Sequence, residues 1–291
     1  MAYAREGVVA VGALPTDPDA PDSTVANGWT GNALLAAIGA WLVGVNAAVC
    51  SLVGRNPSDE PLRFFARAAV DVTSVGTASA REAKPDYSEP PPDQLDKLAQ
   101  GWMVHLCRMS TPRQLEIVRA VRQRVPLLTV DSAYRGDGVG AYRAELFEIA
   151  EDCDAIVLGR RDLEEVWPHE SPREALRLLA RSGARCVVMK LGGGAAIGFQ
   201  SDVRTWIPGF PPGSPAIMPG GDAYAAAFAA AFADNRDLRR AMAWAGAAAS
   251  AVVESASPLE LLNDYGRRAV ASRLKVLESQ SIDGWRSGSP A

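Results

Sequence analysis

The chain has 291 residues, of which 48% are hydrophobic and 22% charged, and its formal net charge is −4. This length and composition can bury a large core, as one large domain or two smaller ones. Acidic and basic residues are mixed along the chain, so no surface for nucleic acid or an anionic membrane is predicted. The longest apolar stretch, residues 33–53, is interrupted by Gly39, Gly44 and Asn46, which argues against a membrane span.

The four cysteines lie far apart and form no Cys-x-x-Cys pair, so neither a zinc site nor a disulfide framework is indicated. No charged-then-apolar pattern of a secretion signal precedes Gly7. We therefore expect a soluble protein of the reducing cytoplasm.

Short apolar runs alternate with helix-like segments along the chain. The runs typical of buried strands are residues 8–12, 47–54, 103–107, 127–131, 155–159 and 186–192. The helix-like segments between them are residues 32–44, 111–124, 141–153 and 171–183. In the last of these, Ser171 is the expected N-cap and Gly183 the expected stop. The alternation predicts an α/β fold, a three-layer α/β/α domain with a mostly parallel central sheet.

Residues 1–281 are expected to form a single domain, followed by a flexible C-terminal tail at 282–291. The segment 78–94 is rich in proline, serine and charge and is expected to be a surface loop.

The stretch MPGGDAYAAAF, residues 218–228, places Gly220, Gly221 and Asp222 directly before an alanine-rich helical segment. A glycine pair leaves the amides of a helix start uncovered, and these amides and the helix dipole favour an anion such as phosphate. The alternative is that Asp222 is only an N-cap above a packed helix.

Ligands of open α/β sheets bind beyond the carboxyl ends of the strands, so residues that follow the strands are candidates. Asp131 and Arg135 follow one run, and each could equally be a cap or a surface side chain. The glycines at 192–194 follow another run, and three in succession would let a ligand approach the backbone, whereas a plain turn needs only one.

Four stretches together resemble the ribokinase-like (PfkB) carbohydrate kinases. PGGDAYAAAF resembles the second family signature, and VVMKLGGGAAIGF resembles the strand and glycine turn beside the nucleotide. VDSAYR and DAIVLGRRDLEEV resemble two further family segments, while residues 29–54 resemble the first signature more weakly.

The resemblance implies transfer of the γ-phosphoryl group of ATP to a hydroxymethyl group of a sugar, nucleoside or similar molecule, with Mg²⁺. It implies that Asp222 is the general base and that the turn of Gly220 and Gly221 is the anion hole. The implied substrate-binding residues are Asp17, Gly31 and Asn32. The implied nucleotide-binding residues are Lys190, Gly192, Gly193, Gly194 and Gly246, and the implied metal residue is Asp162.

The sequence departs from the family pattern at several positions. By spacing, Leu35 stands where the family has a sugar-contacting asparagine, and Gly159 and Asp162 stand where it has asparagine and glutamate. Pro219 stands where the family has a glycine, which removes one backbone donor. The family's lid is expected to be reduced or absent, so the protein would be a monomer or a homodimer that does not use the lid. A catalytically degenerate relative that binds a small ligand or a nucleotide is the alternative.

Overall fold

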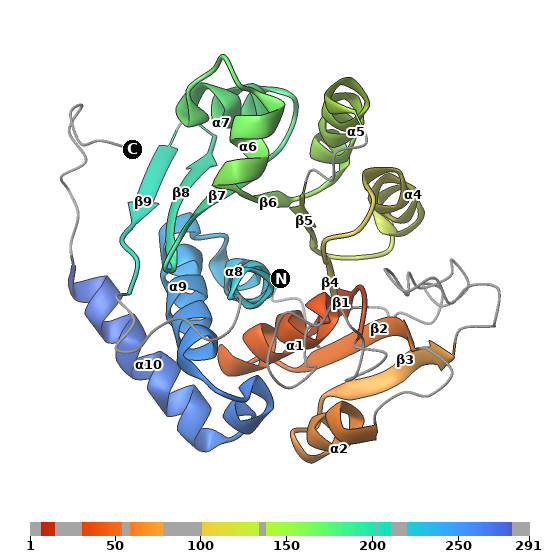
Figure 1. Cartoon of the computed structure of the whole chain (residues 1–291), viewed down its shortest axis with the longest axis vertical. Helices are drawn as coiled ribbons and strands as arrows, with labels where there is room; N and C mark the ends of the chain where they lie inside the picture. Colours follow the sequence, from red (N-terminus) through yellow and green to blue (C-terminus); the bar gives the residue numbers. More distant parts are fainter. Residues whose placement is uncertain are drawn as a thin grey trace.

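The computed structural model describes residues 7–14, 31–53, 59–77, 101–133, 138–201, 203–210 and 220–280. Its nine strands form one sheet in the order β3-β2-β1-β4-β5-β6-β7-β8-β9 (Figure 1). Neighbours from β3 to β7 pair in parallel, and β8 and β9 add two antiparallel strands at one edge. The strands are β1 (Val8–Val11), β2 (Ala47–Val53), β3 (Asp71–Thr77), β4 (Met103–Leu106), β5 (Leu128–Ser132), β6 (Ala155–Gly159), β7 (Cys186–Gly192), β8 (Ala195–Gln200) and β9 (Val203–Ile207).

Helices cover both faces of the sheet. On one face lie α1 (Asn32–Leu42), α2 (Asp59–Arg67), α8 (Gly221–Asn235), α9 (Leu238–Glu254), the 3-10 turn η1 (Pro258–Leu261) and α10 (Asp264–Ser279), and on the other lie α4 (Thr111–Val121), α5 (Val139–Asp152), α6 (Arg160–Val166) and α7 (Pro172–Arg181). Val8 and Ala10 point into one hydrophobic core, while Val9 and Val11 point into the other. Both faces of this strand are therefore buried, as a parallel sheet between two helical layers requires. The predicted three-layer fold is confirmed.

All six predicted strands are present, and α7 begins as predicted, with Ser171 Oγ accepting a hydrogen bond from the amide of Glu174. The strands β3, β8 and β9 and the helices α2, α6 and α10 were not predicted. Asp17, Arg135, Pro219, the loop at 78–94 and the tail at 282–291 lie outside the described residues. Among the helices that the structure describes, none is long and apolar enough to cross a membrane.

Helix α8 is buried on nearly all sides, and its aromatic side chains Tyr224, Phe228 and Phe232 lie in the core. It packs closely on α1, because Gly39 of α1 sits against the backbone of Ala223. A side chain at position 39 would overlap the carbonyl oxygen of Ala223. The absence of a side chain at Gly39 therefore sets how near the start of α8 lies to α1.

We expect Gly39→Ala to lower the free energy of unfolding by about 1–3 kcal/mol, because the added methyl group must displace the backbone of α8. The matched control is Gly140→Ala in α5, where a Cβ meets no atom within 4 Å. This control should be neutral or stabilising by up to about 1 kcal/mol, since alanine favours the helix more than glycine. Urea denaturation of both variants measures the difference, and equal effects would show that the α1–α8 contact is not tight.

Candidate active site

Charged side chains meet at the edge of the sheet where the parallel strands end. Arg108 lies two residues after β4, Asp131 lies near the end of β5, and Lys190 lies near the end of β7. Asp222 lies in the first turn of α8, whose N-cap is Gly220. The edge formed by the carboxyl ends of the strands is where α/β folds of this kind bind ligands.

Asp222 and Arg108 form a bidentate ion pair. Arg108 Nε donates to Asp222 Oδ1 and Arg108 Nη2 donates to Asp222 Oδ2, both at 2.9 Å. The Asp222 side chain is only 4% exposed, whereas that of Arg108 is 39% exposed. The nearby carboxylate of Asp222 raises the pKa of Arg108 above its already high value, so the guanidinium stays charged. Asp222 therefore binds Arg108 and is not the N-cap of α8.

Lys190 links the sheet to the start of α8. Its Nζ donates to both carboxylate oxygens of Asp131 at 2.8 Å and to the carbonyl oxygen of Gly221 at 3.3 Å. Both side chains of the ion pair are largely buried. Burial raises the pKa of Asp131 to about 6, against the opposing effect of the positive charge on Lys190. Lys190, predicted to bind the nucleotide, therefore also holds α8 in place.

Two buried neutral side chains, Gln114 and His105, lie next to these charged groups. Gln114 Nε2 donates to the carbonyl oxygens of Cys107 at 2.9 Å and Asp131 at 2.8 Å, which joins the ends of β4 and β5. His105 Nδ1 lies 2.9 Å from Thr129 Oγ1. Burial, and next the charge of Lys190, lower the pKa of His105 to about 3, so this histidine is neutral at physiological pH.

The predicted substrate residues Gly31 and Asn32 lie at the start of α1, beside Arg108. Gly31 is the buried N-cap of the helix. Asn32 Oδ1 accepts a hydrogen bond from the amide of Ala13 at 2.8 Å, and Asn32 Nδ2 donates to the carbonyl oxygen of Arg108 at 2.6 Å. Asn32 thus fixes the backbone that carries the guanidinium.

The two glycines before Asp222 have different reasons to be glycine. A Cβ on Gly220 would lie 2.7 Å from Val253 Cγ2 and 3.0 Å from the carbonyl oxygen of Ala249, so packing against α9 excludes a side chain there. A Cβ on Gly221 would meet only Lys190 Nζ, at 3.8 Å, and its backbone φ is not positive. Neither packing nor backbone geometry requires a glycine at position 221, which leaves the approach of a ligand as a reason.

The glycines at 192–194 form a tight hairpin between β7 and β8. Gly192 pairs with Ala195, which leaves Gly193 and Gly194 as a two-residue turn with φ of 58° and 80°. Positive φ at both central residues is typical of a type I′ turn, so the hairpin itself explains these glycines. A Cβ on Gly194 would lie 3.1 Å from the carbonyl oxygen of Gly246 in α9. The turn therefore packs directly on α9 at this point, and nucleotide contact by these glycines stays a prediction.

The predicted metal residue Asp162 lies in the first turn of α6, and its Oδ2 accepts a hydrogen bond from the amide of Gly159 at 3.0 Å. A Cβ on Gly159 would lie 2.6 Å from this oxygen, so the glycine makes room for the carboxylate. The negative charge of Asp162 also acts on Arg108. Within the described residues, no group of three or more histidine, cysteine or acidic side chains is placed to hold a metal ion.

Arg108 is the main site residue that the sequence analysis missed, although it follows the predicted strand 103–107 directly. Applying the strand-end rule to this strand as well would have found it. Asp131 is one of the predicted candidates, but its buried pairing with Lys190 is not predicted, because a partner 59 residues away cannot be identified from local pattern.

The fold and the strand-edge site define an α/β protein of the ribokinase type. The pfkB family carbohydrate kinase profile matches residues 8–263, so the chain belongs to this family of phosphotransferases with an alcohol group as acceptor. The solved structures similar to it include a putative ribokinase II from E. coli in complex with ATP and Mg²⁺, with 16% identity and a TM-score of 0.73 over 93% of this chain and 99% of that one.

Two other solved structures show the same fold. Aminoimidazole riboside kinase from Salmonella enterica has 14% identity and a TM-score of 0.70, over 92% of this chain and 99% of that one. Phosphofructokinase-2 from Escherichia coli has 16% identity and a TM-score of 0.69, over 94% and 99%. No curated protein matches the chain in sequence.

Lys190→Met should make the stability of the protein depend more strongly on pH. Without the ammonium group of Lys190, only the smaller effect of the Arg108 charge still opposes burial, so the pKa of Asp131 in the folded state rises further above that of an unfolded aspartate. Stability is then retained at low pH, where Asp131 is protonated, and is lost as the pH rises through the folded-state pKa. At pH 8 the loss should reach about 3–5 kcal/mol, with a smaller loss at pH 5.

Urea denaturation at both pH values measures this difference. The control is the double variant Asp131→Asn, Lys190→Met, which lacks the titrating group. If the single variant shows no more pH dependence than the double variant, Asp131 does not carry a buried charge that Lys190 offsets.

Proposed function

We propose that the protein is an ATP-dependent kinase that transfers the γ-phosphoryl group to a hydroxymethyl group of a sugar, a nucleoside or a similar small molecule. Asp222 would be the general base, and the first-turn amides at Gly220, Gly221 and Asp222 would stabilise the developing charge. The observation that carries the proposal is a buried carboxylate at the start of a 15-residue helix, next to a glycine that neither packing nor φ requires. Such a helix start favours phosphate through its amides and its dipole.

Phosphoryl transfer requires the attacking hydroxyl group to be in line with the phosphorus, a base to accept its proton, and fixed donors toward the charged oxygens. The Asp222 carboxylate is oriented by Arg108, and each of its oxygens keeps a further acceptor position beside the one that Arg108 uses. The carbonyl of Gly221 is held by Lys190, which sets the direction of the amides that follow. Donors that are already in place need no reorganisation when charge develops.

On the nucleotide side, the proposal places ATP along Lys190, the 192–194 turn and Gly246. Mg²⁺ would bind mainly phosphate oxygens and water, so one nearby carboxylate, Asp162, is compatible with it. When bound, the metal would neutralise charge on the phosphate groups. All four cysteines are free and buried, which is consistent with the cytoplasm as the place of action.

The alternative is a degenerate family member that binds a nucleotide or small ligand without turnover. The bidentate Arg108–Asp222 pair favours this non-catalytic alternative, because a carboxylate that binds a guanidinium is less available to accept a substrate proton. An ATP-consumption assay with a panel of sugars and nucleosides, combined with thermal denaturation with and without ATP, separates the two functions. Turnover supports the kinase, whereas stabilisation by ATP without turnover on any acceptor supports the binding protein.

We expect Asp222→Asn to lower kcat by about 10²- to 10⁴-fold, the contribution of a positioned base. Nucleotide affinity should not fall, because the substitution preserves the shape of the side chain and removes the negative charge that binds Arg108. Asp234→Asn, at the other end of α8, is the matched control and should retain activity. Steady-state kinetics and calorimetric titration with an ATP analogue measure the two effects, and wild-type turnover in Asp222→Asn would refute its role as base.

Gly221→Ala should obstruct the approach of the ligand without impairing folding. The methyl group meets no close atom, so the free energy of unfolding should be unchanged or higher by up to about 1 kcal/mol. Turnover should fall by about tenfold or more, because the methyl group obstructs the amides that face the phosphate. Gly220→Ala is the comparison, since its clash with Val253 and Ala249 should lower stability. Undiminished kcat in a well-folded Gly221→Ala would place the anion elsewhere.

A further inference from the structure

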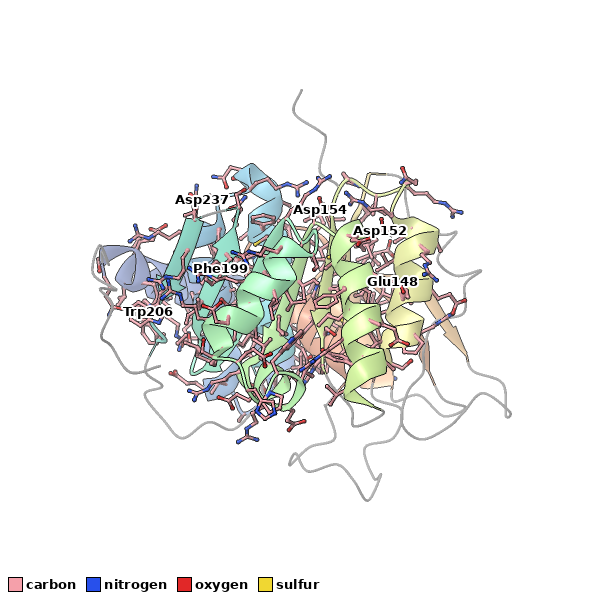
Figure 2. All side chains as sticks on the ribbon, turned by 90° about the horizontal axis from the view of Figure 1, so that it is seen from above. Glu148, Asp152, Asp154, Phe199, Trp206 and Asp237 are labelled. Carbon is pink, nitrogen blue, oxygen red and sulfur yellow. The ribbon has the colours of Figure 1, made fainter. Side chains whose placement is uncertain are left out.

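A second cluster of charge lies between helix α7 and the β8–β9 strand pair. Arg173, Arg177 and Arg181 recur every fourth residue of α7 and therefore share one side of the helix. Together with Arg204 of β9, they line a hollow of about 590 Å³, which Phe199 of β8 also lines. Figure 2 labels Phe199, on the strand that contacts α7.

Four of the described residues that line the hollow are arginines. None of the described residues that line it is acidic. Glu174 pairs with Arg177 from outside the hollow, at 3.0 Å. Arg173, Arg177 and Arg204 line the same hollow, and burial, and next the charges of Arg173 and Arg177, lower the pKa of Arg204. Converging like charges are unfavourable unless an anion lies between them.

We propose that this hollow is a binding site for a small, multiply charged anion that carries phosphate groups. The planar guanidinium donates paired hydrogen bonds that match the geometry of phosphate, and four such groups suit a ligand with more than one phosphate. The volume falls within the range of about 300–1,000 Å³ that is typical of small-molecule pockets. A long polyanion is disfavoured, because the chain has a net charge of −4 and mixed charges and so offers no extended basic track.

The hollow is separate from the candidate active site. Gln200 at the end of β8 pairs with Cys186 at the start of β7, and Ser201, which also lines the hollow, follows Gln200. Lys190 lies near the opposite end of β7, where it contacts the start of α8. The anion site is thus near the amino-terminal edge of the parallel strands, and it does not depend on the proposed kinase function.

Calorimetric titration of the full chain with inorganic tripolyphosphate tests the proposal. The double variant Arg177→Gln, Arg204→Gln should bind about tenfold more weakly or worse, because charge-assisted hydrogen bonds are removed. The control, Arg239→Gln with Arg268→Gln, removes the same charge from exposed positions outside the hollow and should change affinity less than about twofold. Any tripolyphosphate that binds at the start of α8 should bind there equally in the wild type and in both double variants.

Absence of binding to the wild type, or equal weakening in both double variants, would overturn the proposal. Thermal denaturation checks folding, and Arg173→Gln with Arg181→Gln, at exposed positions of α7, repeats the test if the first pair does not fold. Among other probes, inorganic phosphate and citrate should bind more weakly than tripolyphosphate. Tighter binding of a single-stranded oligonucleotide that is lost in the Arg177, Arg204 variant would instead assign the surface to nucleic acid.

Discussion

The ammonium group of Lys190 connects three parts of the chain on which the candidate site depends. It reaches from β7 past β6 to the Asp131 carboxylate of β5, and it also holds the first carbonyl of α8. Because the two charges are largely buried, removing either one leaves the other without compensation, so the position of the helix start is strongly determined. The direction of the first-turn amides, and with it the proposed place for an anion, follows from this contact.

The charges at the strand edge are balanced in pairs. Arg108 is bound to Asp222, and Lys190 is bound to Asp131, so the two cations are matched by two carboxylates before any ligand arrives. Asn32 and Gln114 fix the backbone around these pairs through bonds to main-chain groups. An incoming phosphate therefore depends on the amides and dipole of α8 and on a metal ion, or on Arg108 turning away from Asp222.

Glycines in this protein meet two different physical demands. Those at 193 and 194 adopt positive φ in a hairpin turn, while Gly39 and Gly220 allow helix backbones to pack closely. Gly221 is required by neither demand. A run of glycines in the sequence therefore does not by itself indicate a ligand, and the useful observation is the glycine that the fold leaves unexplained.

The sequence by itself determined six of the strands, the helices α1, α4, α5 and α7 between them, the capped start of α7 and hence the three-layer fold, because apolar periodicity and capping act over a few residues. The sequence did not indicate β3, whose DVTSVGT pattern is polar, or the β8–β9 pair, which ends the sheet in antiparallel orientation.

Asp222 was identified as a candidate from its place at the start of a helix. Its partner Arg108, 114 residues away, was decided only by the tertiary structure, as was the link between Lys190 and Asp131. Such pairs form because parallel strands bring their carboxyl ends to one edge, and which side chains meet there depends on strand order, which local pattern does not encode.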